Sequence, residues 1–252
     1  MKEAPYAWVV VWATFVSLGV IFGVAYSFAA FFDSFAAEFS AKRADVALVF
    51  GLTGLIYFAF GAVGGMLSDR FGARLICSLG MLCIAAGLLL TSFAQSLNAV
   101  YLFYSVGIGV GIALAYTPSI GNVQPWFTTR RGLASGIASS GIGLGTLLVP
   151  LLATLLIASM DWRMALRMMS AAVIMVGLGS TLLLKRAQLG PRNSSTPLPG
   201  LTLAQALKDK RFWWFYLFTF TAAPTMFIPF ATCQLQRVTL ASAKRMRWAW
   251  SA

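Results

Sequence analysis

Charge is scarce in this 252-residue chain. Only 10% of its residues are Asp, Glu, Lys or Arg, histidine is absent, and there are three cysteines. The lack of histidine excludes His general bases, His proton relays and His-based metal sites. Cys77, Cys83 and Cys233 lack the spacing of metal ligands, and no serine lies in a Gly-x-Ser-x-Gly elbow. We therefore expect no catalytic residues, no metal and no cofactor, and an enzyme is not the expected class.

Hydrophobic residues are abundant instead. They make up 59% of the chain, whose mean hydropathy is +0.80, whereas a soluble domain has about 45–50% apolar residues. A helix of about 20 apolar residues crosses the ~30 Å hydrocarbon layer of a bilayer. The long uncharged runs are Trp8–Phe32, Val46–Leu67, Leu75–Val123, Gly132–Met160, Met168–Leu184 and Phe212–Gln236.

The third run is long enough for two crossings and is divided by the polar turn Ala94–Asn98. The sequence therefore predicts an all-α integral membrane protein with six spans and a seventh after a polar stretch. A cleaved signal peptide is an alternative for the first run, but that run is far longer than the ~7–15 apolar residues of such a peptide.

Basic residues indicate the orientation of these spans. With a cytoplasmic N-terminus, the inner segments hold Lys2, the pairs Arg70 with Arg74 and Arg130 with Arg131, and six basic residues between 185 and 211. The outer segments before the seventh span hold only Lys42, Arg43, Arg163 and Arg167. This bias follows the positive-inside rule. The net charge of +12 thus indicates topology and contact with lipid headgroups, and no nucleic-acid partner is expected.

The turn between the second and third spans, GGMLSDRFGARLI, holds an unusual group of charges. It contains Gly65, Asp69, Arg70, Gly72 and Arg74. Glycine adopts the backbone angles of a tight reversal at little cost. An aspartate weakens the positive bias and is not needed for topology, so we expect Asp69 to accept hydrogen bonds from a neighbouring helix end or an arginine.

This turn resembles the signature loop of the major facilitator superfamily, with Ala73 where the family usually has a basic residue. The stretch WFTTRRGLASGIASSGIGLGTLLVP, which contains Arg130 and Arg131 before the fifth span, resembles the monocarboxylate transporter branch and its oxalate/formate antiporter-like relatives. So do Tyr6–Val11 and Asp161–Arg163. The resemblance implies the six-helix N-terminal half of a major facilitator fold plus a seventh helix. It also implies that the turn between the second and third spans is a conformational latch, in which Arg70 and Arg74 support Asp69.

The resemblance also implies a secondary active carrier of small organic anions such as monocarboxylates, a multi-pass protein of the plasma membrane, or of the inner membrane if bacterial. The first five spans contain no Lys or Arg, so the cation that an anion requires is expected in the other half of the family fold. Candidate cavity residues are Tyr26, Tyr57, Tyr116, Asn122 and Ser139, with Ser27, Thr53, Thr117 and Ser140 as further polar groups. Each is at least as well explained by contacts between helices.

Small residues recur every four positions in the fifth span and indicate close helix packing, as do the glycines of the fourth. They are Gly132, Gly136 and Ser140, then Gly141 and Gly145, and in the fourth span Gly107, Gly109 and Gly111.

We expect four regions: a bundle at 1–184, a cytoplasmic linker with a short interfacial helix at 185–211, a seventh span at 212–231, and a basic tail at 232–252. The tail breaks the positive-inside pattern and lacks the family resemblance. It is therefore interpreted as out of frame, which makes the chain a truncated form whose second half, or a second copy, is missing. Two alternatives remain open: an inactive fragment or partner half, and a major facilitator carrier of another solute, such as a drug exporter.

Overall fold

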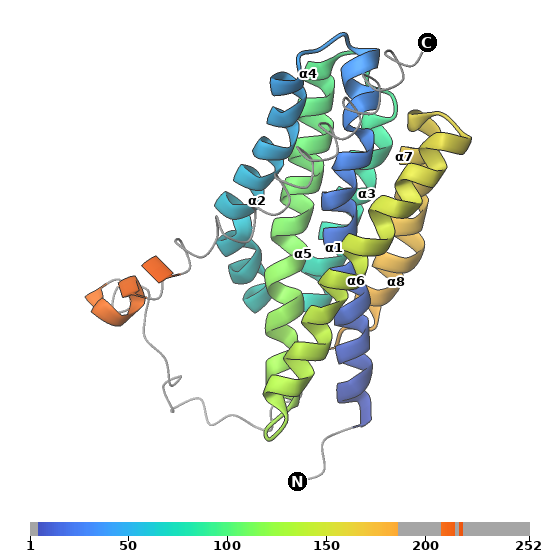
Figure 1. Ribbon diagram of the computed structural model, residues 1–252. Helices are drawn as coiled ribbons and strands as arrows, with labels where there is room; N and C mark the ends of the chain where they lie inside the picture. The colour runs from blue at the N-terminus through green and yellow to red at the C-terminus, as the bar shows by residue number, and fades with distance from the viewer. Residues whose placement is uncertain (1–4, 186–207, 215–216, 219–252) are drawn as a thin grey trace, which may run out of the picture. The chain divides into compact units, whose positions relative to one another are not determined.

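The computed structural model describes residues 5–185, 208–214 and 217–218. The chain divides into two compact units, Met1–Gly190 and Pro191–Ala252. The first unit is a bundle of long helices that run roughly along one axis (Figure 1). Its elements are α1 Pro5–Glu38, α2 Arg43–Phe71, α3 Ala73–Thr91, α4 Leu97–Val100, η1 Tyr101–Val106, α5 Gly107–Val123, η2 Gln124–Trp126, α6 Arg131–Ser159, α7 Trp162–Ala172, η3 Val173–Leu178 and α8 Gly179–Leu182.

Six helices of this unit are long and apolar enough to cross a membrane. Two of them are composite: Leu97–Trp126 joins α4, η1, α5 and η2, and Trp162–Leu182 joins α7, η3 and α8. The segments η1 and η3 are π-helical. No strand occurs in the described ranges. The prediction of an all-α integral membrane protein with six spans before the polar stretch is confirmed.

Glycines determine how closely α1 and α6 approach. A Cβ added at Gly145 would fall on the carbonyl oxygen of Gly19, and one added at Gly141 on that of Phe15. Helices in lipid associate through such backbone contacts, since lipid provides no hydrophobic drive. The predicted packing role is confirmed for Gly141 and Gly145. In contrast, a Cβ at Gly132 or Gly136 would meet open space.

The predicted close packing of the fourth span is also confirmed. A Cβ on Gly111 would lie 2.7 Å from the Gly80 carbonyl oxygen of α3, and one on Gly109 would lie 3.0 Å from the Thr53 carbonyl oxygen of α2. Helix α5 therefore lies between α2 and α3, with its backbone near both.

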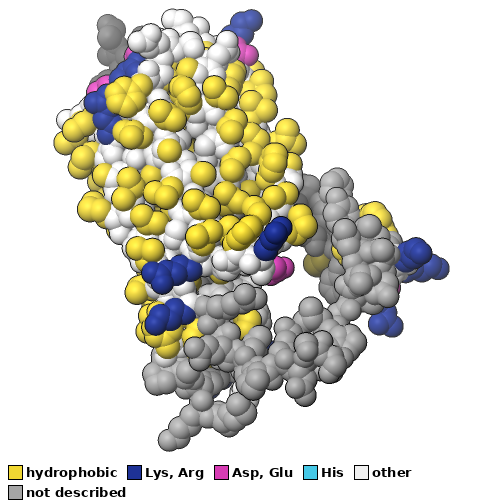
Figure 2. All heavy atoms as spheres, turned by 180° about the vertical axis from the view of Figure 1, so that it is seen from behind, with side chains coloured by type: hydrophobic (Ala, Val, Ile, Leu, Met, Phe, Trp, Pro, Cys, Tyr) yellow, Lys and Arg dark blue, Asp and Glu magenta, His cyan; other side chains and the backbone are white. Residues whose placement is uncertain are grey.

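The outer helices α2 and α6 expose most of their apolar surface. In their most apolar windows only 17% of residues are buried inside the protein, against 56% in α1. Their exposed side chains include Leu55, Phe58, Leu147 and Leu151. Figure 2 shows hydrophobic side chains spread over one face of the bundle, with Lys and Arg near its two ends. This surface suits a hydrocarbon environment, in which helices satisfy their backbone polar groups internally.

In the second unit, residues 210–214 and 217–218 are helical. The Asp209 carboxylate accepts a hydrogen bond of 2.9 Å from the Arg211 backbone nitrogen, as a residue preceding a helix does. Most of the predicted interfacial helix, most of the seventh span and the basic tail lie outside the described residues, and the four predicted regions stay predictions.

Candidate functional site

The turn between α2 and α3 depends on Gly72. Its φ of +91° is one that side chains with a Cβ rarely adopt. Its backbone nitrogen donates a 2.8 Å hydrogen bond to the Ser68 carbonyl oxygen, which ends α2. A Cβ here would meet no neighbouring atom, so the backbone angle and not crowding requires glycine. The prediction that Gly72 provides the backbone angles of this tight reversal is confirmed.

The charged side chains of this turn face outward. Asp69, Arg70 and Arg74 are exposed, and none of them forms an ion pair with another described residue. The Arg70 guanidinium lies 5.4 Å from the centre of the Phe71 ring. No described residue donates a hydrogen bond to Asp69. The expectation of such a donor is therefore not met among the described residues, and the latch role stays a prediction.

The glycine of this motif that packs most closely is Gly64, which the sequence analysis did not single out. Gly64 is buried, and a Cβ there would fall on the Ala113 carbonyl oxygen of α5. At Gly65 the nearest atom to an added Cβ is Cγ2 of Thr117, at an ordinary 3.5 Å. The adjacent glycines Gly64 and Gly65 were the feature of the sequence that could have indicated this close contact with α5.

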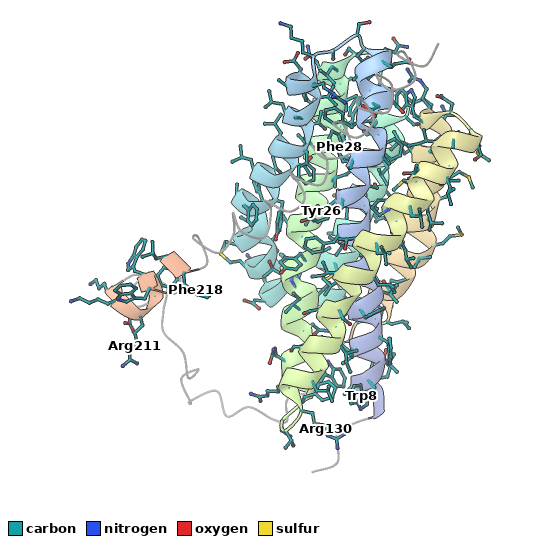
Figure 3. All side chains as sticks on the ribbon, in the orientation of Figure 1. Trp8, Tyr26, Phe28, Arg130, Arg211 and Phe218 are labelled. Atoms are coloured by element: carbon teal, nitrogen blue, oxygen red, sulfur yellow. The ribbon has the colours of Figure 1, made fainter. Side chains whose placement is uncertain are left out.

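Three of the five predicted cavity residues meet in one aromatic cluster. Tyr26 of α1, Tyr57 of α2 and Tyr116 of α5 are half-buried. The ring centres of Tyr57 and Tyr116 are 5.9 Å apart, and Phe22 links them to Tyr26 with ring distances of 5.1 Å to Tyr116 and 6.5 Å to Tyr26. Figure 3 places Tyr26 near the middle of the bundle, far from Trp8 and Arg130 at one end. We call these four residues the tyrosine cluster.

The chemistry of the tyrosine cluster is amphipathic. Its rings provide apolar and quadrupolar surface, and its phenol groups provide hydrogen-bond donors at mid-depth. No Lys, Arg, Asp or Glu lies on α1, α2 or α5 near these positions. The described part of the cluster can thus hydrogen-bond an anion but not neutralise it.

Asn122 and Ser139 do not join the cluster. Asn122 donates a 3.1 Å hydrogen bond from Nδ2 to the Lys185 carbonyl oxygen, near the end of the bundle. Ser139 is half-buried on α6. Of the further polar candidates, three hydroxyls donate to carbonyl oxygens of their own helices, which satisfies them locally. These are Ser27, Thr53 and Ser140.

The two arginines before α6 differ. Arg131 donates a 2.6 Å hydrogen bond from Nε to the Phe127 carbonyl oxygen and so closes the turn between α5 and α6. Arg130, the residue before the helix, is exposed. Both lie at the start of α6, where the sequence analysis expected them.

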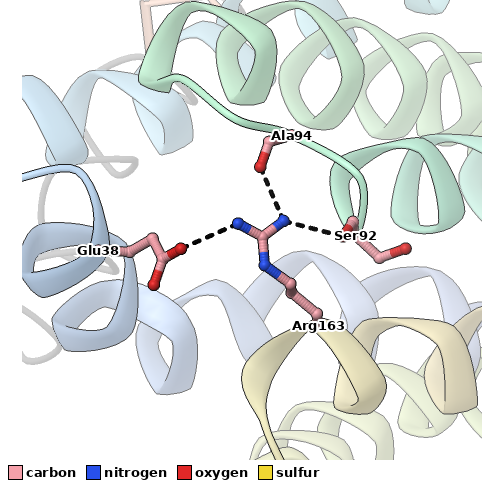
Figure 4. A network of polar contacts seen from close by, with 4 residues as sticks. All are labelled: Glu38, Ser92, Ala94 and Arg163. Atoms are coloured by element: carbon pink, nitrogen blue, oxygen red, sulfur yellow. Dashed lines mark hydrogen bonds and ion pairs between the residues drawn. The ribbon is translucent and has the colours of Figure 1, made fainter.

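The opposite end of the bundle holds a polar network centred on Arg163 (Figure 4). Its guanidinium donates from Nη1 to the carbonyl oxygens of Ser92 (3.1 Å) and Ala94 (2.8 Å), and from Nη2 to Oε1 of Glu38 (2.9 Å). Arg167 adds a 3.2 Å bond to Oγ of Ser92. These contacts tie α1, the turn after α3, and α7 together. Sequence analysis noted Arg163 as an outer basic residue and Asp161–Arg163 as part of the family resemblance, and it did not predict this network.

Comparison with known proteins places this arrangement in a family. The sequence model of the Major Facilitator Superfamily matches residues 10–242, which extends past residue 231, where the sequence analysis ended the resemblance. Monocarboxylate transporter 13 of Bos taurus is 36% identical over 170 residues, covering 67% of this chain and 40% of that protein. Monocarboxylate transporter 11 of Mus musculus is 32% identical over 233 residues, covering 90% of this chain and 51% of that protein.

Among solved structures, a crystal structure of the peptide transporter POT (E310Q mutant) in complex with sulfate is similar, with a TM-score of 0.62 and 18% identity. The match covers 87% of this chain and 46% of the transporter, and it shows the fold alone. This chain spans about half the length, or less, of each of these three proteins. On the family match and the six-span bundle, the chain belongs to the major facilitator superfamily and is related to its monocarboxylate transporters.

Proposed function

We propose that this chain is half of a secondary active transporter that carries small organic anions, such as monocarboxylates, by alternating access. The observation that carries the proposal is the tyrosine cluster, which draws side chains from three spans to mid-depth in a chain related to monocarboxylate transporters. Carriers of this kind bind substrate near the middle of the bilayer, between two halves.

The tyrosine cluster supplies only part of such a site. Phenol hydroxyls donate hydrogen bonds to a carboxylate, but a buried anion without a positive partner costs several kcal/mol or more. The first five spans hold no Lys or Arg between their ends. We therefore assign the cation, or helix N-termini in its place, to a second six-helix half that pairs with this chain.

The charged turn between α2 and α3 acts as the conformational latch in this proposal. Asp69, assisted by Arg70 and Arg74, contacts the second half in one state and releases it in the other. A cytoplasmic N-terminus places this turn inside the cell, in the plasma membrane or in the inner membrane of a bacterium. The exposure of all three side chains supports the assignment.

Uptake of radiolabelled lactate, pyruvate, formate and oxalate into vesicles tests the proposal. The chain is reconstituted alone and together with the C-terminal six-helix half of a monocarboxylate transporter. We expect uptake of at least one anion when both halves are present. Uptake of none of them, with both halves inserted, contradicts the proposal. Uptake by the chain alone rules out the requirement for a second half.

Removing single hydroxyls tests the tyrosine cluster itself. A hydrogen bond to a charged group contributes about 1.5–3 kcal/mol, so Tyr57→Phe or Tyr116→Phe should raise KM roughly tenfold or more. Tyr101→Phe is the matched control, because that hydroxyl donates to the Asp45 carbonyl oxygen outside the cluster. Equal KM values in all three variants contradict a role of the cluster in substrate binding. Inhibition by apolar drugs but not by anions would favour a carrier of another solute.

A further inference from the structure

A groove runs between α3 and α8 on the outside of the bundle. It has a volume of about 400 Å³. Its walls are mainly aliphatic, and its lining consists of Phe71, Arg74, Leu75, Ser78, Leu79, Leu82 and Leu182. The hydroxyl of Ser78 is hydrogen-bonded to that of Thr181 at 3.0 Å. Arg74 is the ionisable side chain among the residues that line this groove.

The leucines of α3 form a continuous apolar wall below Arg74. Leu75, Leu79 and Leu82 are spaced by four and three residues, which places them on one face of a helix. From Arg74 to Leu82 the helix advances about 12 Å. Such a wall can accommodate part of a lipid acyl chain, with the guanidinium at one end.

The charge of Arg74 is available to a ligand. The side chain is exposed, and it has no hydrogen bond or ion pair to any residue in the described part of the chain. Asp69, the carboxylate of the same turn, does not line the groove. An anion at this position would thus meet an uncompensated cation.

A second groove provides an internal comparison. It lies between α1 and α8, has a volume of about 340 Å³, and is lined by Trp8, Val9, Trp12, Ala13, Val16, Ser180 and Leu183. None of these residues is charged. The two grooves thus share α8 and an apolar character but differ in the arginine.

We propose that the α3–α8 groove binds one anionic phospholipid, with an acyl chain along the leucines of α3 and the phosphate paired with Arg74. Charge complementarity selects this occupant, because a zwitterionic lipid presents its own cation beside the phosphate. The α1–α8 groove takes acyl chains without preference for the headgroup. The site shares Arg74 with the latch of the proposed function, and because lipid binding is measured without transport, its failure and that of the proposed function are distinguishable.

Native mass spectrometry of the full chain, purified in detergent and titrated with phosphatidylglycerol or phosphatidylcholine, tests the site. We expect tighter binding of phosphatidylglycerol. A basic residue near the membrane surface contributes about fivefold to binding of anionic lipid, so Arg74→Gln should weaken phosphatidylglycerol binding about fivefold. Arg74→Lys should retain most of it. Arg130→Gln, which removes an exposed arginine of another turn, should leave it unchanged.

Blocking the apolar wall tests the other half of the site. Leu79→Trp should reduce phosphatidylglycerol binding, whereas Leu147→Trp, at a side chain that is 68% exposed on α6, should not. A phosphatidylglycerol with a photoreactive acyl chain should label the peptide that contains Leu79 and Leu82. This experiment uses the wild-type protein, so no substitution can disturb the fold.

Four results overturn the proposal. The first is equal binding of the two lipids, and the second is an equal loss in Arg74→Gln and Arg130→Gln. The third is photolabelling confined to the peptide that contains Trp8 and Trp12. The fourth is competition against the photoreactive lipid by millimolar inorganic phosphate that is as effective as competition by phosphatidylglycerol, which would mean that Arg74 binds free phosphate and that the groove has no part in it.

Discussion

The two ends of the bundle use charge in opposite ways. At the end where α1 finishes, Arg163 binds Glu38 at 2.9 Å and Arg43 binds Asp33 at 3.4 Å. At the end where α1 begins, Asp69, Arg70, Arg74 and Arg130 are exposed and form no ion pair in the described part of the chain. Charges at the first end hold helices to one another. Those at the second end are available to groups outside the bundle.

Geometry explains why the Arg163 network matters more than its ion pair alone. The guanidinium binds two carbonyl oxygens of the turn after α3, where the chain leaves the helix and carbonyl groups lack intrahelical partners. One side chain thus satisfies a helix end and joins it to α1. At the other end, the exposed charges of Asp69, Arg70, Arg74 and Arg130 make no such contact with described residues, and water solvates them at little cost.

Among the substitutions that test this difference between the two ends, Arg163→Ala is expected to have the largest effect. This substitution removes the three hydrogen bonds that the Arg163 guanidinium donates, and the Arg163 side chain is only 27% exposed. Because water partly replaces them, we expect a loss of about 2–3 kcal/mol in the free energy of unfolding. Thermal or steric-trap unfolding of the reconstituted protein measures it.

Glu38→Gln is the control for that substitution, since it leaves both carbonyl contacts of Arg163 in place. Its cost should be well below that of Arg163→Ala. If the two substitutions destabilise equally, the ion pair carries the network and the carbonyl bonds contribute little.

An intermediate effect, on transport and not on stability, is expected from Asp69→Asn. The residue is exposed and forms no ion pair with a described residue, so unfolding should change by less than about 0.5 kcal/mol. In the proposed two-half transporter a latch at Asp69 would bias the conformational states, and its loss should slow transport roughly tenfold. Vesicle uptake with both halves present measures it. Unaltered kinetics would count against the latch.

The smallest effect is expected from Arg43→Ala. Nη2 of Arg43 lies 3.4 Å from Oδ1 of Asp33, and the side chains of Arg43 and Asp33 are 66% and 87% exposed. Such pairs contribute about 0–1 kcal/mol, so the unfolding free energy should barely move. A loss comparable to that of Arg163→Ala would show that ion pairing as such, and not the carbonyl network, distinguishes the two ends.

Sequence reasoning predicted the number of spans better than their ends. Hydropathy placed the start of the sixth span at Met168, whereas the helix begins at Trp162. The difference comes from Arg163 and Arg167, which interrupt the apolar run but face polar groups of a neighbouring turn. A one-dimensional pattern counts their charge and does not see their partners.

The candidate site was predicted residue by residue but not as an arrangement. The polarity of Tyr57 and Tyr116 within apolar spans singled them out, yet nothing local indicates that their rings meet across two helices. Asn122 carried the same signal and binds a backbone carbonyl at the bundle end. For the turn at Gly72 the local signal sufficed, because its backbone angle is a property of that single residue.

The glycine contact between α1 and α6 has a consequence for biosynthesis. Its two sides, Gly19 and Gly145, are 126 positions apart in the sequence. At about 5–20 residues per second, the ribosome needs on the order of ten seconds to make the intervening chain. During that interval the small-residue face of α1 lacks its final neighbour, so the first span must either wait among lipids or be held by the insertion machinery until the fifth arrives.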